Sequence, residues 1–327
     1  MSQTSLSLVA DIGGTNTRVA LADGHKVRDG SIRRFSNADY PGLESVLRQY
    51  IDEAEVDPDA ACVAVAGPVR DGRATMTNLD WTMDKDTIAR ATKSETVAIL
   101  NDLQAQGHAL GYIREENLHR IVEGSGQDNP NAAKLVIGIG TGFNVAPVYD
   151  VEEGRVVPPA EAGHANLPIR TEAELRLCNF VSSAHGFPAV EDVVSGRGLE
   201  RVYSWLGHEA GDPKEARAKD IMDECAQDKN GRAADAARVF TKIFGTVAGN
   251  LSLIHLPFGG VYLVGGVARA FGPFLNEYGF ADAFRDKGRF AGFMHNFSVS
   301  LIEDDYAALT GSASHIHALL HGKQEIS

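Results

Sequence analysis

The chain has 327 residues, of which 43% are hydrophobic and 23% are charged, which is the composition of a globular protein long enough for two domains. Its formal net charge of -13 argues against partners that need a basic face, namely nucleic acids and anionic membrane surfaces. A small anionic substrate would have to bind through local N–H groups, lysine or arginine side chains, or a metal ion.

The first hundred residues are predicted to begin with strands and to continue with alternating strands and helices, which indicates one α/β domain with a mixed sheet. A buried strand from Leu6 to Ala10 ends next to Asp11, and a glycine turn leads into a second strand over Thr17–Ala22. Further strands are expected over Lys26–Phe35, Ala61–Ala66, Ala74–Asn78 and Thr96–Leu100, and helices over Leu43–Ala54, from Asp84 to Ala91 and over Leu103–Tyr112.

The rest of the chain repeats this layout in part. Glu123–Lys134 is expected to be a loop, and Leu135–Val148 then forms a second strand–turn–strand unit that resembles the opening hairpin, a weak internal repeat. Thr171 and Glu174 form a capping-box pattern at the start of a helix that runs to Ala184. Helices are also expected over Leu199–Leu206, Gly211–Asp228, Ala233–Leu256, from about Ala268 and over Tyr306–Leu320, and strands over Gly260–Val264 and Asn296–Ile302.

The opening glycine turn is a candidate phosphate site. Free N–H groups at Gly13 and Gly14 suit phosphate oxygens, and a carboxylate beside phosphate, here Asp11, suits a magnesium ion. The alternative is an ordinary hairpin whose turn needs glycine. The chain has no GxxxxGK[ST] motif, and the glycines at 138, 140 and 142 do not have the GxGxxG spacing, so neither a P-loop nor a Rossmann dinucleotide site is expected.

Three further places carry candidate site residues. Asn101 and Asp102 follow a strand of an α/β sheet, at the edge where ligands bind, so Asp102 either caps the next helix or accepts a proton from a substrate hydroxyl. Glu161 and His164 lie three apart in a loop, which suits a polyol better than zinc. Glu191 precedes a glycine-rich loop and would by itself be a surface residue.

Cysteine spacing and the N-terminal segment indicate a cytoplasmic protein. Cys62, Cys178 and Cys225 are far apart and odd in number, which fits reduced thiols better than disulfides or a metal site. The N-terminal segment lacks the basic stretch of a signal peptide, and no window approaches the roughly 20 apolar residues of a membrane span. We therefore expect neither secretion nor a membrane partner.

Five segments in sequence order resemble the motifs of the bacterial glucokinase family in the sugar kinase/actin superfamily. They are LVADIGGTNTRVAL (first phosphate motif), LNDLQAQGHAL (catalytic aspartate), IGIGTGFNVA (second phosphate motif), EAGH with EDVVSGRGL (sugar loops) and GGVYLVGGVARAF (adenosine motif). The resemblance spans nearly the whole chain. It implies two ribonuclease-H-like α/β domains with mixed sheets flanked by helices, around a cleft. It also implies a small domain of residues 1–108 with 306–327, a large domain of residues 109–305, and a homodimer.

The resemblance also implies an activity and a role for each candidate residue. The reaction would be ATP- and magnesium-dependent phosphoryl transfer to the 6-hydroxyl of D-glucose, with Asp102 as the general base. Asp11 would engage magnesium, directly or through water. Glucose would be bound by Asn78, Asn101, Asp102, Glu161, His164 and Glu191, and ATP by Gly13, Gly14, Thr15, Asn16, Gly140, Thr141, Gly142, Gly265 and Gly266.

The chain departs from the family pattern at two places. Phe143 and Asn144 stand where the family commonly has Leu-Gly, a change that can alter the turn or the fit of the nucleotide, and Ala162 replaces a usual glycine and can reshape the sugar pocket. The cysteine-rich zinc motif of the related repressor/open-reading-frame/kinase proteins does not follow His164, which indicates the zinc-free branch.

Alternatives within and outside the kinases stay open. A kinase for mannose, fructose or an amino sugar is one, because a single misplaced hydroxyl decides epimer choice. A sensor that binds sugar or ATP without turnover is another, although the phosphate motif begins by residue 11 and leaves no room before it for the DNA-binding domain of related regulators. An actin-like structural ATPase would leave the Asp102 and Glu191 motifs without a purpose.

Overall fold

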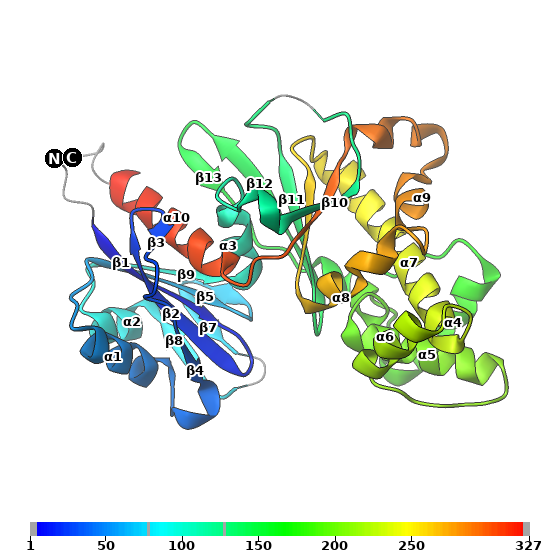
Figure 1. The fold of residues 1–327 in the computed structure, drawn as a ribbon, viewed down its shortest axis with the longest axis horizontal. Coiled ribbons are helices and arrows are strands. Elements are labelled where there is room, and N and C mark those ends of the chain that lie inside the picture. Colours follow the sequence, from blue (N-terminus) through cyan, green and yellow to red (C-terminus); the bar gives the residue numbers. More distant parts are fainter. Residues whose placement is uncertain (1–4, 77–78, 127–128, 323–327) are drawn as a thin grey trace. The chain divides into compact units, whose positions relative to one another are not determined.

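The computed structural model describes residues 5–76, 79–126 and 129–322 (Figure 1). The chain divides into two compact units, which are Met1–Arg114 with Val151–Pro159 and Asp304–Ser327, and Glu115–Asp150 with Ala160–Glu303. Each unit has a mixed sheet, flanking helices and a buried core of its own. The predicted fold class, two ribonuclease-H-like α/β domains with mixed sheets, is confirmed.

The sheet of the first unit has the strand order β3-β2-β1-β5-β9, and β4 also pairs with β2. Strand β1 is antiparallel to β2 and parallel to β5, which is parallel to β9. The parallel strands therefore end at one edge, where Ile12, Val65 and Asn101 are neighbours in register. The strand bounds are β1 (Leu6–Ile12), β2 (Asn16–Asp23), β3 (Lys26–Val27), β4 (Arg33–Ser36), β5 (Ala60–Val65) and β9 (Thr96–Asn101).

Helices cover both faces of this sheet, because alternate residues of its strands are apolar on either side. On one face, Leu8 and Ala10 pack in a cluster with α1 (Leu43–Ala54) and α2 (Lys85–Thr92). On the other face, Val9 packs in a cluster with α3 (Asp102–Ala109) and α10 (Ala307–Gly322). A small antiparallel sheet of β6 (Val69–Arg70), β7 (Arg73–Thr75) and β8 (Thr82–Asp84) belongs to the same unit.

The sheet of the second unit repeats the first in outline, and the five of its six strands that belong to this unit have the order β10-β15-β14-β11-β12. Strand β11 is antiparallel to β12 and parallel to β14, which is parallel to β15, and β10 is antiparallel to β15. The strand bounds are β10 (Leu118–Val122), β11 (Lys134–Ile139), β12 (Phe143–Val151), β14 (Val261–Val264) and β15 (Val299–Ile302). The helices are α4 (Glu172–His185), α5 (Gly196–Glu209), α6 (Ala218–Gln227), α7 (Arg232–His255), α8 (Gly266–Leu275) and α9 (Phe280–Arg285).

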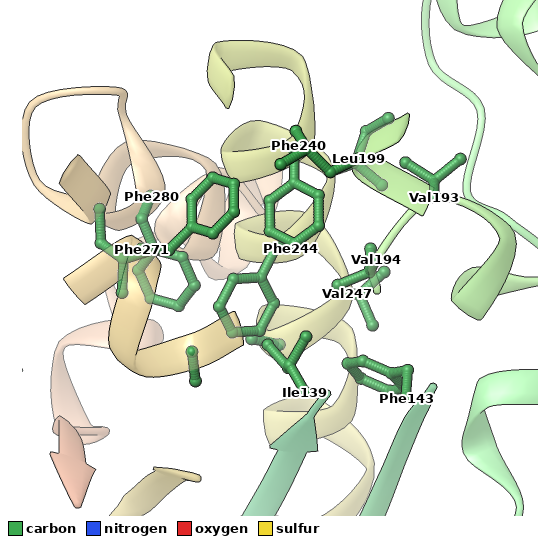
Figure 2. Close-up of a cluster of buried hydrophobic side chains, with 14 of the residues drawn as sticks. Ile139, Phe143, Val193, Val194, Leu199, Phe240, Phe244, Val247, Phe271 and Phe280 are labelled. Atoms are coloured by element: carbon green, nitrogen blue, oxygen red, sulfur yellow. The ribbon is translucent and has the colours of Figure 1, made fainter. Parts of the chain in front are cut away.

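The core of the second unit is rich in phenylalanine and is centred on the long helix α7 (Figure 2). Phe240 and Phe244 of α7 are fully buried, and Phe240 stacks on Phe271 of α8 with ring centroids 4.2 Å apart. The ends of the β11–β12 hairpin, Ile139 and Phe143, belong to the same cluster. This core therefore holds the glycine turn between those two strands.

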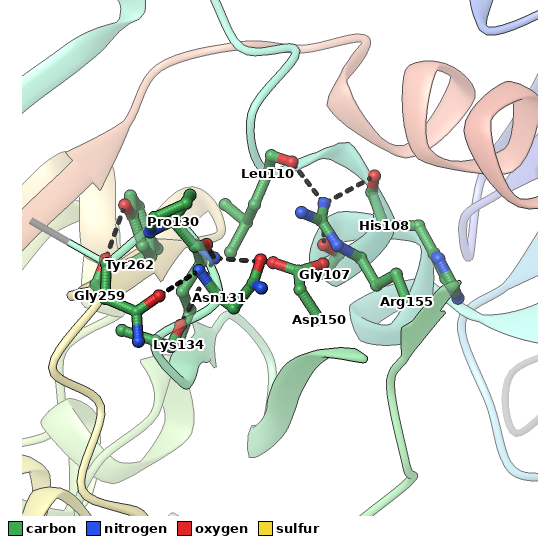
Figure 3. Close-up of polar contacts among 12 residues, drawn as sticks. Gly107, His108, Leu110, Pro130, Asn131, Lys134, Asp150, Arg155, Gly259 and Tyr262 are labelled. Carbon is green, nitrogen blue, oxygen red and sulfur yellow. Dashed lines mark hydrogen bonds and ion pairs between the residues drawn. The ribbon is translucent and has the colours of Figure 1, made fainter. Parts of the chain in front are cut away.

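Residues 151–159 group with the first unit. They contain strand β13 (Gly154–Val156) and contact helix α3. The Gln104 side chain donates to the carbonyl of Val157 at 2.8 Å. The Arg155 guanidinium donates to the carbonyls of His108, at 3.3 Å, and of Leu110 (Figure 3). A cation at this end of α3 also complements the helix dipole.

Most predicted elements are present, with some corrected bounds. The segment Lys26–Phe35 is two short strands rather than one, because the chain turns where Ser31 N donates to the carbonyl of Arg28 at 3.2 Å. The helix predicted over Gly211–Asp228 covers only α6, and strands β8 and β10 and helix α9 were not predicted. Among the described residues, no helix is both long and apolar enough to cross a membrane.

Candidate active site

The turn between β1 and β2 is closed by a hydrogen bond from Gly13 N to the carbonyl of Asn16 at 3.0 Å. A buried side chain supports it from outside the motif. Asn37 Nδ2 donates to the carbonyl of Gly13 at 2.8 Å, and Asn37 Oδ1 accepts from Thr17 Oγ1 at 2.8 Å. Gly14 and Thr15 are exposed at the tip. The turn is thus rigid at its base and open at its tip, as an anion-binding turn requires. The sequence pattern did not predict the role of Asn37.

Asp11 lies at the end of β1, where its register partner on β2 is Arg18. Arg18 Nη1 is 3.2 Å from Asp11 Oδ2. Burial raises the pKa of Asp11, and the charge and hydrogen bond of Arg18 act against that rise. A magnesium ion that arrives with ATP needs only one or two protein carboxylates, so a half-buried Asp11 beside the glycine turn fits it.

Asn101 and Asp102 stand at the same edge of the same sheet, where β9 meets α3. Asn101 caps the helix, because its Oδ1 accepts from Gln104 N at 3.0 Å while Gln104 Oε1 accepts from Asn101 N at 3.1 Å. Asp102 is the first residue of α3, and its Oδ1 accepts from Leu103 N at 2.9 Å. The cap is therefore Asn101, and capping does not account for the carboxylate at position 102.

The second glycine turn joins β11 to β12 and contacts the start of α5. Gly140 N donates to the carbonyl of Gly142 at 2.9 Å, and Gly196 N donates to the carbonyl of Gly140 at 2.9 Å. Glu191 Oε2 accepts from Phe143 N at 3.3 Å, so this half-buried carboxylate is a neighbour of the turn rather than an isolated surface group. A glycine turn and a helix N-terminus are both elements that suit phosphate.

The segment with Glu161 and His164 lies beside the segment with Glu191. Two backbone hydrogen bonds join them, from Val190 N to the carbonyl of Ala165 and from Leu167 N to that of Pro188, both at 2.9 Å. Glu161 and His164 are exposed. The described residues contain no group of three histidine, cysteine, aspartate or glutamate side chains that could hold a metal ion. The arrangement brings the three predicted sugar ligands of this unit together.

Buried side chains next to these segments hold them in place (Figure 2). Phe143, directly after the second turn, is 4% exposed and packs in the core. Val193 and Val194, two and three residues after Glu191, are fully buried in the same cluster. The ring of Phe143, which is larger than the leucine side chain common in the family, is therefore accommodated in this core. Ala162, which stands where the family usually has glycine, also packs against this cluster.

The predicted adenosine motif also lies next to the Gly140–Gly142 turn. Gly265 precedes α8 with φ of 103°, and a Cβ added to it would lie 2.3 Å from the carbonyl oxygen of Ile139. Only glycine fits there. A Cβ added to Gly196 would lie 3.5 Å from the Val267 side chain. The starts of α5 and α8 and the Gly140–Gly142 turn are therefore neighbours within the second unit.

A cavity of about 540 Å³ is lined by α5, by α4 and by residues 215–220, and the residue pattern did not predict it. Its lining includes Phe180, Arg197 and Arg201. Arg201 is paired with Asp192 at 3.0 Å. Because Arg197 directly follows Gly196, the cavity begins beside the second glycine turn.

The first unit thus brings together Asp11, the Gly13–Asn16 turn, Asn101 and Asp102, and the second unit brings together the remaining candidates that the structure describes. The predicted sugar ligand Asn78 lies outside the described residues.

The chain is similar to known glucokinases. A glucokinase family model matches residues 8–319. The glucokinase of Erwinia tasmaniensis is 33% identical over 319 residues, which are 97% of this chain and 98% of that protein. The crystal structure of a glucokinase from an Antarctic psychrotroph has 28% identity and a TM-score of 0.85, over 96% of this chain and 99% of that one. A ROK family glucokinase from Streptomyces griseus, in complex with glucose and AMPPNP, has 19% identity and a TM-score of 0.58, over 95% of this chain and 98% of that one, and shares the fold. The chain belongs to the glucokinase family.

Proposed function

We propose that this protein transfers the γ-phosphoryl group of ATP, with magnesium, to the 6-hydroxyl of D-glucose, giving glucose 6-phosphate and ADP. One observation carries the proposal beyond family membership. Asn101 caps α3, and Asp102, the first residue of α3, stands at the ligand-binding edge of the sheet in the same unit as Asp11 and the first glycine turn. That edge then holds a proton acceptor, a magnesium ligand and N–H groups that can donate hydrogen bonds to phosphate.

In this mechanism Asp102 accepts the proton of the sugar 6-hydroxyl as that oxygen attacks the γ-phosphorus. The bond between the γ-phosphorus and the bridging oxygen breaks, and ADP leaves with the electron pair. Phosphoryl transfer needs mainly positioning and charge neutralisation. The N–H groups of the two glycine turns would bind the phosphates, and Asp11 would hold the magnesium ion, directly or through water, which would supply neutralisation of the phosphate charge.

The sugar would be held by carboxylates and an imidazole, which suit its hydroxyls. Glu161, His164 and Glu191 serve this purpose in the second unit, and Asn101 and Asp102 in the first. For the nucleotide, Gly265 and Gly266 let the adenosine approach the backbone. The cavity lined by Arg197 adjoins the start of α5, which neighbours the start of α8, and we assign it to the nucleoside end of ATP.

An assay of ADP release with ATP and magnesium tests the proposal. It is run with glucose, mannose, fructose, glucosamine and no sugar. Release with glucose well above every other arm supports a glucokinase. Faster release with another hexose would make the protein a kinase for that sugar. Sugar binding in calorimetry without ADP release would favour a sensor.

We further propose that the protein works as a homodimer in the cytoplasm. The family resemblance supports the homodimer, and the three buried free cysteines suit a reducing compartment. Light scattering on the purified protein measures the mass in solution, and a mass of one chain would contradict the dimer.

A further inference from the structure

Asn144 connects the second glycine turn to the segment that carries Glu161. It is the second residue of β12, and its amide makes contacts in both directions. The oxygen Oδ1 accepts from Val145 N at 2.8 Å and from Ala162 N at 3.1 Å. The nitrogen Nδ2 donates to the carbonyl of Ala160 at 2.5 Å and to Glu161 Oε2 at 3.3 Å. Both polar atoms of the side chain are thus used to hold residues 160–162.

The two positions at which this chain departs from the common family pattern are therefore in contact. A glycine at position 144 has no side chain to hold the neighbouring segment, and the donor that Asn144 Oδ1 accepts from belongs to Ala162. Ala162 itself packs against the core of the unit. The segment before and after Glu161 is consequently fixed on one side by apolar packing and on the other by one amide.

The arrangement restricts the position of the Glu161 side chain. Its side chain is exposed, and an exposed glutamate samples several rotamers whose loss opposes binding. The hydrogen bond from Asn144 Nδ2 restricts the carboxylate without neutralising it, so the second carboxylate oxygen can still accept from a hydroxyl. The hydrogen bonds from the Asn144 amide to the backbone of Ala160 and Ala162 fix the backbone on both sides of Glu161, and so the point from which its side chain extends.

We infer that Asn144 is a positioning residue for the sugar site, which acts by holding Glu161 in place for a sugar hydroxyl. This inference rests on the proposed function, since it assigns a sugar ligand to Glu161. Asn144 thereby connects the segment that carries Glu161 to β12, the strand that follows the second glycine turn.

The test compares Asn144→Gly and Asn144→Asp with the wild-type protein. The glycine variant removes all side-chain contacts. The aspartate variant keeps the acceptor for Ala162 N, loses both donations and places a second carboxylate beside Glu161. Loss of one hydrogen bond to a charged group corresponds to about a tenfold change in affinity. We therefore expect the Kd of glucose in calorimetry without ATP, and the KM for glucose, to rise about tenfold, with the KM for ATP changed less than about twofold.

Asn296→Gly is the matched control. Asn296 is also half-buried and also bonds through its amide, donating to the carbonyl of Phe293 at 2.8 Å and accepting from Ser125 Oγ at 3.3 Å. Its loss should lower the melting temperature to a similar extent and leave the glucose Kd unchanged. Equal glucose affinity in the wild type and both Asn144 variants would overturn the inference. A wild-type protein that neither binds nor phosphorylates glucose would instead overturn the proposed function.

A double-mutant cycle separates action through Glu161 from a general loosening of the site. Glu161→Ala is combined with Asn144→Gly, and glucose Kd is measured for all four proteins. If Asn144 acts through Glu161, its substitution weakens binding in the wild-type background and changes it less than about twofold in the Glu161→Ala background. Additive losses would contradict the inference even if each single variant binds weakly.

Discussion

Glu191 and Gly142 are packed so closely that a Cβ atom added to Gly142 would lie 2.7 Å from Glu191 Oε2. A predicted sugar ligand is therefore in van der Waals contact with the predicted phosphate turn. Gly142→Ala forces the Glu191 carboxylate to move. We expect kcat/KM for glucose to fall at least about tenfold, since misplacing one charged ligand costs more than about 1.4 kcal/mol. Steady-state kinetics measures this.

Gly292→Ala controls for the added methyl group, because nothing lies within 4 Å of a Cβ at that position and the residue is in the same unit. It should behave as wild type. A Gly142→Ala protein with unchanged kinetics would show that Glu191 plays no part in sugar binding.

Asp102→Asn removes the proton acceptor and keeps the size of the side chain. The oxygen that accepts from Leu103 N at 2.9 Å can be preserved, so the start of α3 should stay folded. General base catalysis contributes roughly 10²–10⁴ in rate, and kcat should fall by about that factor while the glucose Kd changes little. Rapid-quench measurement of a single turnover checks the chemical step. Near-wild-type turnover would remove Asp102 from the role of base.

The elements that the sequence pattern predicted are those with local signals. Asp84 caps α2 by accepting from Thr87 N, and Thr171 with Glu174 forms the capping box of α4, because both motifs need partners only three residues away. At the start of α3, by contrast, the pattern left open whether Asp102 caps the helix or accepts a proton from a substrate hydroxyl. The reciprocal hydrogen bonds with Gln104 show that the cap is Asn101, which the pattern did not predict.

The sequence pattern could not predict the contacts that hold the candidate site, because the residues in contact are distant in sequence. Asn37 bonds Gly13 from 24 positions away, and Asn144 bonds Ala160 from 16. Residues 151–159 group with the first unit, in which Gln104 bonds the carbonyl of Val157, 53 positions away. No helical or strand period encodes such pairs, and each depends on a single polar side chain.

Arg18 is expected to tune magnesium use through Asp11. Its guanidinium opposes the rise that burial causes in the pKa of Asp11, so Arg18→Gln lets that pKa rise further. A protonated carboxyl cannot bind magnesium, and the proton competes best at low pH. The magnesium concentration for half-maximal rate should therefore increase in the variant, and more at pH 6 than at pH 8. A titration at saturating ATP and glucose measures it.

Arg28→Gln is the control for this charge change. Arg28 pairs with Asp23 at 2.7 Å on the exposed surface of the same unit, so its loss should leave the magnesium requirement unchanged. A magnesium requirement that does not change with Arg18→Gln at either pH would contradict the assignment of magnesium to Asp11.

His315 should make the protein less stable in mild acid. Burial, with the Lys85 ammonium as a smaller cause, lowers the pKa of His315 to about 4, and its ring lies 4.4 Å from that of His108. In the unfolded chain the pKa is near 6.5, so below that pH the unfolded state binds a proton that the folded state does not. The free energy of unfolding should fall between pH 6.5 and pH 4, by about 3 kcal/mol in total for this residue.

Urea unfolding at pH 7, pH 6 and pH 5 measures this loss. A neutral His315→Leu variant should show a flatter dependence on pH, because it removes the group that the unfolded state protonates. His119→Gln is the control, since His119 is an exposed surface residue paired with Glu303 at 3.1 Å and should leave the slope near that of the wild type. Equal slopes for His315→Leu and the wild type would mean that His315 is protonated in the folded protein as readily as in the unfolded chain, and that α10 tolerates the charge.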